Sequence, residues 1–234
     1  MFWFYDYWYI VLVMPAVIFS LIASLNVNST FKKYSRVRSS RGITGAEAAR
    51  RVLDANGLYS VRIEQVRGQL TDHFDPRNNT VYLSESVYSV PSAAAIGVAV
   101  HEAGHAVQHA VGYAPIKLRS AIIPVTNFAS KLALPLILIG LLFSASSLIS
   151  LAYVGVACFA MSTVFQLVTL PTEFNASRRA LNAITASGIL SRDDVGDAKK
   201  VLSAAAMTYV AALAVSIMQL LRLLMIVSGS DRRR

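Results

Sequence analysis

Cysteine is almost absent from this chain of 234 residues, in which Cys158 is the only one and lies inside an apolar stretch. A single thiol excludes a disulfide framework and a metal cluster built from thiolates. Any metal ligands must therefore come from histidine and carboxylate side chains.

Charged residues are scarce as well, at 15% of the chain, whereas hydrophobic residues make up 55% and the mean hydropathy is +0.51. This composition is too apolar for an ordinary soluble domain and indicates a polytopic membrane protein. The formal charge of +9 would suit nucleic acid, but no nucleic-acid recognition motif accompanies it. Loops rich in lysine and arginine are common at the cytoplasmic face of membrane proteins, so we predict the lipid bilayer as a partner and no nucleic acid.

The amino-terminal segment lacks a basic leading region and a cleavage site of the A-x-A type, so we expect no cleaved signal peptide. Residues 8–25 are apolar apart from two serines and are long enough to cross the hydrocarbon layer. Residues 1–30 are therefore predicted to form a membrane anchor. An aromatic cluster suited to a membrane interface opens it (Phe2, Trp3, Phe4, Tyr5, Tyr7, Trp8 and Tyr9).

Residues 120–171 are predicted to form a pair of transmembrane helices, because only Lys131 interrupts an almost uncharged stretch of about fifty residues. The expected turn is Ser144-Ala145-Ser146-Ser147. Pro135 falls inside the first helix, where neighbouring helices can accommodate a kink.

A last hydrophobic helix and a tail are predicted for residues 204–234. Its segment 204–227 is long enough to cross a membrane, but Gln219 and Arg222 also allow it to lie against the other helices. The predicted fold is mainly α, a polytopic membrane protein with a bundle of about three to four transmembrane helices and a small α+β domain.

Residues 31–119 form the only long polar stretch and carry many basic residues, so the positive-inside rule predicts a cytoplasmic domain. Within it, Thr44-Gly45-Ala46-Glu47 is a capping box that opens a short helix. Strand patterns at residues 61–66 and 80–83 flank turn residues at 75–79, so a small sheet should precede the next helix.

His101-Glu102-Ala103-Gly104-His105 follows an apolar, alanine-rich segment with helix-start signals at Pro91 and Ser92 and a stop at Gly112. Residues four apart on a helix share a face, about 5–6 Å apart at Cβ, so both imidazoles can reach one Zn²⁺. Glu102 lies beside them, where a carboxylate can take a proton from an activated water. The spacing predicts two metal ligands and a general base, the HExxH arrangement of zinc proteases.

A catalytic zinc needs a third protein ligand, and the sequence offers His109 and Glu173. Ligands from His101 to His109 would extend about 12 Å along one helix, too far for one ion, so His109 is assigned a supporting or structural role. Glu173 has small helical neighbours that let two helices approach closely (Ala176, Ser177 and Ala180). We predict it as the third ligand, within a helix and connector at residues 172–203; the alternative is a carboxylate that only stabilises a helix N-terminus.

The HExxH helix, the two spans that follow and the downstream E-x-x-A-S-x-x-A resemble the gluzincin pattern of membrane zinc peptidases, and most closely the YugP-like neutral zinc metallopeptidases. The resemblance implies Zn²⁺ as the cofactor, His101, His105 and Glu173 as its ligands, and Glu102 as the catalytic base. The related HtpX and CAAX-protease branch carries an aspartate where this chain has Ser177. In this chain, the residue that supports a zinc ligand from that position is therefore weaker, or another residue does so from elsewhere. The resemblance covers Gly42 to Arg222 and includes segments 70–77, 81–84, 101–108 and 208–211.

This resemblance implies a membrane-embedded zinc metalloendopeptidase that hydrolyses a peptide or protein substrate. The oxyanion that forms needs a donor, for which Tyr209, His73 and Arg178 are candidates. The strand at residues 80–83 is predicted to accept an extended substrate by edge pairing. Membrane-protein partners or an oligomer are compatible with the sequence.

Two other functions stay open on the sequence. A non-catalytic membrane scaffold or chaperone could keep zinc for structure, but it would not need Glu102. A transporter would need ionisable groups within its spans, and only Lys131 and Arg222 qualify.

The predicted topology places the amino terminus outside and residues 31–119 and 172–200 inside, with a zinc site at the cytoplasmic face of the cell membrane. The turn near Ser146 is then outside. The basic residues Arg232-Arg233-Arg234 argue against a fourth full crossing of the membrane. Either the last helix turns back to the cytoplasmic side, or the positive-inside rule does not hold at this end.

Overall fold

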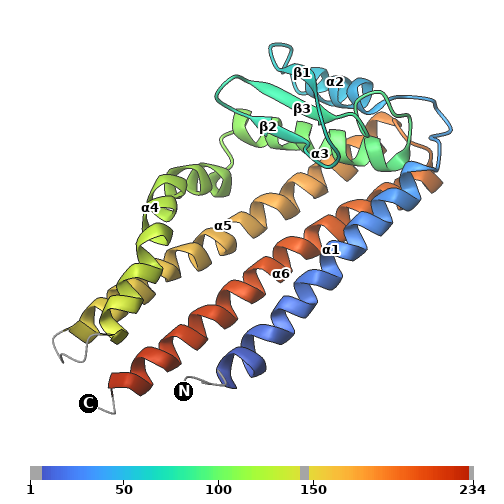
Figure 1. The fold of residues 1–234 in the computed structure, drawn as a ribbon. Coiled ribbons are helices and arrows are strands. Elements are labelled where there is room, and N and C mark those ends of the chain that lie inside the picture. Colours follow the sequence, from blue (N-terminus) through green and yellow to red (C-terminus); the bar gives the residue numbers. More distant parts are fainter. Residues whose placement is uncertain (1–6, 143–147, 232–234) are drawn as a thin grey trace. The chain divides into compact units, whose positions relative to one another are not determined.

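The computed structural model describes residues 7–142 and 148–231 (Figure 1). The predicted turn at 144–147, aromatic residues 2–5 and the arginines at 232–234 lie outside the described residues. The chain divides into two compact units, which are described separately. The apolar unit comprises Met1–Ile22, Leu118–Leu170 and Tyr209–Arg234, and the site unit comprises Ala23–Lys117 and Pro171–Thr208.

Within residues 7–142 and 148–231, four helical segments are long and apolar enough to cross a membrane, which confirms the expected mainly helical membrane fold. The first joins a short π-helix, η1, to α1, and the others are α4, α5 and α6. Their bounds are η1 Tyr9–Val13, α1 Met14–Ser35, α4 Ala114–Leu142, α5 Ile149–Ser187 and α6 Arg192–Asp231.

Proline does not end these helices. Pro135 lies inside α4, as predicted, together with Pro124, and Pro171 lies inside α5. The predicted polar segment after residue 171 therefore continues α5 instead of opening a new element. α6 runs without interruption from Arg192 to Asp231, so the chain does not turn back within this helix.

In the apolar unit, small residues allow helices to pack closely. A Cβ added at Gly155 would lie 2.7 Å from the carbonyl oxygen of Ala133, and one at Gly140 would lie 2.5 Å from the amide nitrogen of Ala152. Such contacts between α4 and α5 are possible only without a side chain, as is common between helices in membranes. α6 also joins this packing. A small buried cluster contains Ile137 of α4, Ala152 and Val156 of α5, and Leu223 and Val227 of α6.

The site unit contains the predicted short helix, α2, at Gly45–Ala55. Thr44 accepts a hydrogen bond from the backbone of Glu47, whose side chain accepts one from the backbone of Thr44, so the capping box is confirmed. Gly57 follows the helix with φ of +72°, a left-handed conformation that favours glycine.

A three-stranded sheet precedes the next helix in the sequence, and it corrects one prediction. β1 (Arg62–Val66) and β3 (Thr80–Ser84) match the predicted strands, whereas β2 (His73–Asp75) was not predicted. The strand order is β1-β3-β2, with β3 parallel to β1 and antiparallel to β2. The prediction that residues 80–83 accept a substrate by edge pairing is wrong, because β3 is hydrogen-bonded on both sides.

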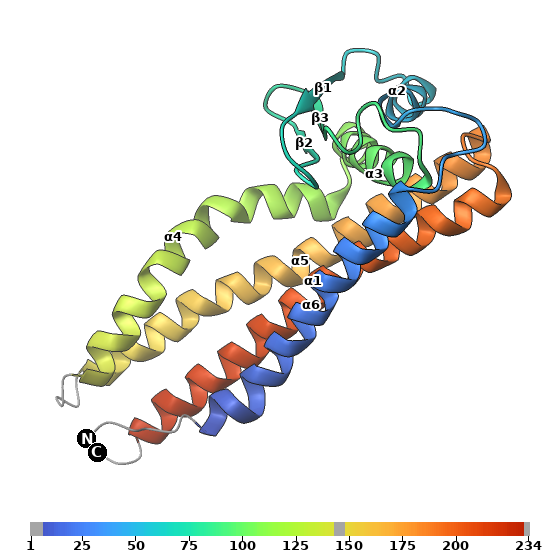
Figure 2. The same cartoon turned by 45° about the vertical axis from the view of Figure 1, so that its right-hand side comes forward.

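α3 (Ala93–Ala110) is the predicted HExxH helix, with Ser92 as its N-cap and Gly112 beyond its end at φ of +65°. It is mostly buried, and it packs against α2 and the sheet (Figure 2). Two glycines set its approach to other helices: a Cβ at Gly97 would meet Cβ of Ala198 in α6 at 3.4 Å, and one at Gly104 would meet the carbonyl oxygen of Ala176 in α5 at 3.1 Å. α3 is therefore the central element of the site unit.

Candidate metal centre

α3 brings three potential metal-binding side chains together. One ligand atom from each of His101, Glu102 and His105 lies within 4.8 Å of the other two. The two imidazole rings are nearly perpendicular, with centroids 4.8 Å apart. This arrangement follows from helix geometry, because residues four apart project from the same face.

α5 adds Glu173 to this group from a distant part of the sequence. Its Oε2 atom lies 3.3 Å from Nε2 of His101 and 3.5 Å from Nε2 of His105, and the residue is only 3% exposed. Ligands at about 2.1 Å from a tetrahedral zinc lie about 3.4 Å from one another. The distances from Oε2 of Glu173 to the two Nε2 atoms therefore match the separation expected between ligands of one zinc ion.

Small residues make the approach of α5 to α3 possible. Gly104, between the two histidines, faces the backbone of Ala176, and Ala176 and Ala180 are fully or almost fully buried. A larger side chain at Gly104 would push away the helix that carries Glu173. The sequence predicts that small residues near Glu173 let two helices approach closely, and the contact between Gly104 and Ala176 agrees with this prediction.

Gln108 fixes the orientation of His105. Its Nε2 donates to the carbonyl oxygen of Thr172 at 2.8 Å and to Oδ1 of Asn175 at 3.0 Å. Its Oε1 must then face Nδ1 of His105 at 3.0 Å, and an amide oxygen can only accept, so Nδ1 carries the proton. In the neutral imidazole the lone pair of His105 is therefore on Nε2, the atom that faces Glu173.

Arg179 extends this hydrogen-bond network along α5. Its Nε donates to Oδ1 of Asn175 at 2.8 Å, and because arginine has no acceptor, this contact identifies the atom as oxygen. The same oxygen accepts from Gln108. Arg179 thus supports the amide that holds His105.

Ser177 has the corresponding position beside the other histidine. Its Oγ lies 3.2 Å from Nδ1 of His101, one helical turn after Glu173. A hydroxyl is a neutral partner and polarises an imidazole less than a carboxylate would. The two histidines therefore have different partners, a buried amide for His105 and a half-buried hydroxyl for His101.

The electrostatics of the site favour a positive charge between these groups. Burial lowers the pKa of His105, but the hydrogen bond to Glu173 and the negative charges of Glu102 and Glu173 outweigh it and raise the pKa above its ordinary value. The carboxylates of Glu102 and Glu173 therefore favour a cation beside His105. A metal ion satisfies the same requirement.

Asp72 is a second carboxylate near Glu102. Its two oxygens accept hydrogen bonds from the backbone and the hydroxyl of Ser84, at 2.7 and 3.0 Å. Burial raises the pKa of Asp72 above its usual value, the bonds from Ser84 oppose this rise, and the charge of Glu102 adds to it. Negative charge thus accumulates around the HExxH helix.

The other predicted site residues have separate contacts. His109 packs its ring against Phe74 at 5.5 Å and is not part of the close group on α3. His73 stacks on Tyr82 at 4.9 Å and donates from Nδ1 to the carbonyl oxygen of Thr71. Arg178 is exposed on α5, and Tyr209 belongs to the part of α6 in the apolar unit. An oxyanion role for Tyr209, His73 or Arg178 stays a prediction.

Sequence reasoning missed Gln108, Asn175 and Asp72 as parts of the site. Gln108 had a usable signal, because it is a polar residue three positions after His105 and so lies near it on the same helix. Asn175 had none, because its contact with Gln108 depends on how α5 packs on α3. Asp72 depends in the same way on the unpredicted strand β2.

Comparison with known proteins identifies the family. Residues 9–228 match the family described as "Putative neutral zinc metallopeptidase". A Bacillus subtilis (strain 168) protein described as "Putative membrane protease YugP" is 50% identical over 224 residues, which are 95% of this chain and 98% of that protein. No solved structure matches the chain. With the HExxH group on α3 and Glu173 beside it, these similarities show that the chain belongs to the family of putative neutral zinc metallopeptidases.

Proposed function

We propose that the protein is a membrane zinc endopeptidase in which His101, His105 and Glu173 hold the ion and Glu102 is the general base. The single observation that carries this proposal is the position of Oε2 of Glu173, within 3.5 Å of the Nε2 atoms of both histidines. A zinc ion held by these residues would supply a Lewis acid that polarises a water molecule and the carbonyl of a peptide bond.

Glu102 has the position that a general base requires. Its carboxylate lies within 4.8 Å of the ligand atoms of both histidines, and the residue is half-buried, so it can face the same water molecule. It accepts a proton from the attacking water and passes this proton to the leaving amine.

The edge strand β2 is the proposed binding site for the substrate backbone. Among the described residues, β2 pairs with β3 along one side only, so its other side can accept an extended peptide. β2 also contacts the HExxH helix through Phe74 and His109. Pairing at this edge would bring a substrate to α3 through backbone hydrogen bonds, with little dependence on its side chains.

We also propose that residues 31–119 face the cytoplasm, because this segment is rich in lysine and arginine whereas the segments before and after it are nearly uncharged. Cysteines introduced at Arg67 and Ser146, in a chain with Cys158→Ser, should be labelled from opposite sides of sealed vesicles. Labelling of both from the same side would contradict this topology.

The peptidase assignment is tested by Glu102→Gln in the purified full-length protein in detergent. Glutamine keeps the shape of the side chain but cannot accept a proton, so peptide cleavage should be lost while bound zinc stays near one ion per chain. Glu85→Gln, at an exposed position outside the site, is the matched control and should retain both. Unchanged cleavage in Glu102→Gln would refute the assignment, and zinc binding without cleavage in the unsubstituted protein would indicate a structural zinc site.

A further inference from the structure

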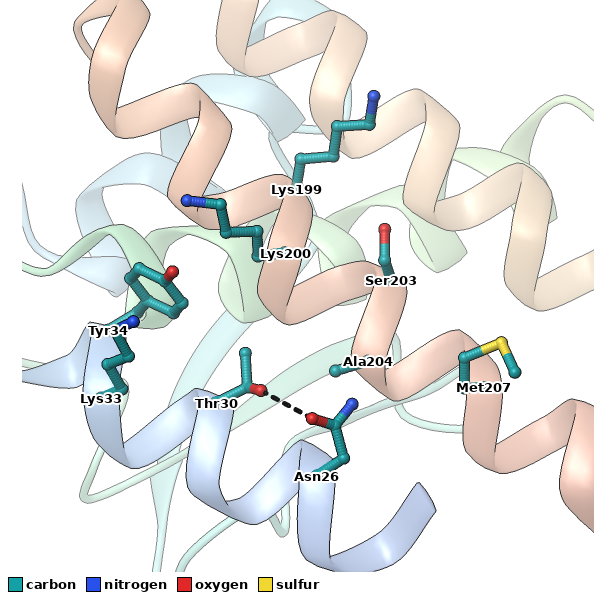
Figure 3. A pocket seen from close by; sticks show the side chains of 9 residues that line it. All are labelled: Asn26, Thr30, Lys33, Tyr34, Lys199, Lys200, Ser203, Ala204 and Met207. Atoms are coloured by element: carbon teal, nitrogen blue, oxygen red, sulfur yellow. Dashed lines mark hydrogen bonds between the residues drawn. The ribbon is translucent and has the colours of Figure 1, made fainter. Parts of the chain in front are cut away.

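A cavity of about 470 Å³ lies between α1 and α6 in the site unit and shares no residue with the metal centre (Figure 3). The last turns of α1 and the first turns of α6 line it. Both helices are candidate membrane spans, and the lining residues lie at the ends of these spans. The cavity is therefore placed where a chain that crosses a membrane meets the lipid headgroups.

Positive charge dominates the lining. Lys33, Lys199 and Lys200 contribute three ammonium groups, and no acidic residue is among the lining residues. The Nζ atoms of Lys33 and Lys200 lie 5.3 and 5.2 Å from the ring centroid of the buried Tyr34 (Figure 3). Two cations that converge on one ring repel each other, so an anion between them would be stabilised.

Neutralisation by the protein itself is incomplete. Lys200 forms an ion pair with Asp197 at 3.0 Å. In the part of the chain that the structure describes, Lys33 and Lys199 form no ion pair. The cavity thus keeps most of its positive charge for a bound ligand.

The lining also changes in character along the cavity. At the end away from the lysines, Ala204 and Met207 form an apolar part on α6, whereas Asn26 lines this end from α1. The hydroxyl groups of Thr30 and Ser203 lie between this end and the lysines. α1 rises about 1.5 Å per residue, so Lys33 lies about 12 Å beyond Leu25, where the apolar segment ends. Long lysine side chains can bend back from that level toward the membrane interface.

We propose that this cavity binds the phosphate headgroup of an anionic phospholipid. The lysines would contact the phosphate, the hydroxyl groups would contact the glycerol ester region, and the apolar part would contact the first methylenes of the acyl chains. Free phosphate has the same charge but would leave the apolar part unused, so the order of groups along the cavity favours a lipid. Basic pockets between membrane helices bind anionic lipids in this way.

The test measures thermal stabilisation of the full-length protein in a neutral detergent by dihexanoyl phosphatidylglycerol, dihexanoyl phosphatidylcholine and inorganic phosphate. The phosphatidylglycerol should raise Tm with saturation, and the other two should not at the same concentrations. In Lys33→Gln/Lys199→Gln the apparent affinity should fall about twenty-five-fold, since each lysine near an anionic lipid contributes about five-fold. Ser203→Trp fills the cavity without a change in charge and should also abolish saturation.

Lys32→Gln/Lys117→Gln is the matched control, because it removes the same charge from exposed positions that do not line the cavity. Its affinity for phosphatidylglycerol should be unchanged. An equal loss in both double variants would show that net charge alone attracts the lipid and would overturn the proposed site. Equal saturation by inorganic phosphate, or no saturable effect of phosphatidylglycerol, would overturn it as well. All of these outcomes are independent of peptidase activity.

Discussion

The two sides of the candidate metal centre depend on different levels of structure. On α3, the positions of His101 and His105 follow from four-residue spacing on one helix. On α5, the position of Glu173 follows from the close contact between Gly104 and Ala176, which are far apart in sequence. The first side is therefore tolerant of changes in tertiary packing, whereas the second side exists only when the two helices are correctly packed.

The largest effect is expected when the α5 side is removed. Glu173→Ala should lose most bound zinc and all peptidase activity, because two histidines alone do not hold a catalytic zinc. His109→Ala should retain zinc, with a defect in activity of at most roughly ten- to a hundredfold. Zinc stoichiometry is measured on both purified variants. A zinc-free His109→Ala protein would mean that α3 supplies all the ligands and that α5 is not a separate side of the metal centre.

A smaller effect is expected from the residues that orient the two histidines. Gln108→Leu removes a fully buried acceptor for Nδ1 of His105, so zinc affinity should fall by roughly ten- to a hundredfold. Ser177→Ala should cost less, because water can replace a half-buried hydroxyl at His101. Titration with a zinc chelator measures the zinc affinity of both variants. A greater loss of affinity in Ser177→Ala than in Gln108→Leu would show that Ser177 is the more important of the two partners.

The smallest of these effects concerns the spacing of α3 and α5. A Cβ at Gly104 would meet a backbone oxygen at 3.1 Å, so Gly104→Ala should move α5 by a few tenths of an ångström and lower kcat/KM by about tenfold. Gly97→Ala adds the same methyl group to the same helix, but at an ordinary contact distance of 3.4 Å from Ala198. Its kcat/KM should stay near that of the unsubstituted protein. If both variants were equally active, the close approach at Gly104 would not determine the position of Glu173.

Local sequence signals predicted the elements that depend on local interactions. The capping box at Thr44, the N-cap at Ser92 and the stop at Gly112 are visible in the sequence because each involves neighbours within a few residues. β2 has only three residues and forms because β3 lies beside it, so no periodic pattern in the sequence predicts this strand. The order of the strands, and hence the correct edge for a substrate, also depends on pairing between segments that sequence patterns do not relate.

The candidate site follows the same division. The HExxH spacing identifies His101, Glu102 and His105, and the small residues near Glu173 indicate a close helix contact. The amide network of Gln108 and Asn175 could not be predicted, because the two residues belong to helices that meet only in the folded protein.

The amide of Gln108 has a consequence for how fast the site can be filled. All of its hydrogen-bonding contacts are to protein groups, and it has no exposure to solvent, so the ring of His105 keeps one orientation and one tautomer in the folded chain. The side chain is thus preorganised, and no ring rotation or change of tautomer has to precede coordination. The rate of metal uptake should then depend on how quickly an ion reaches the site and sheds its hydration water, with no contribution from rearrangement of this ligand.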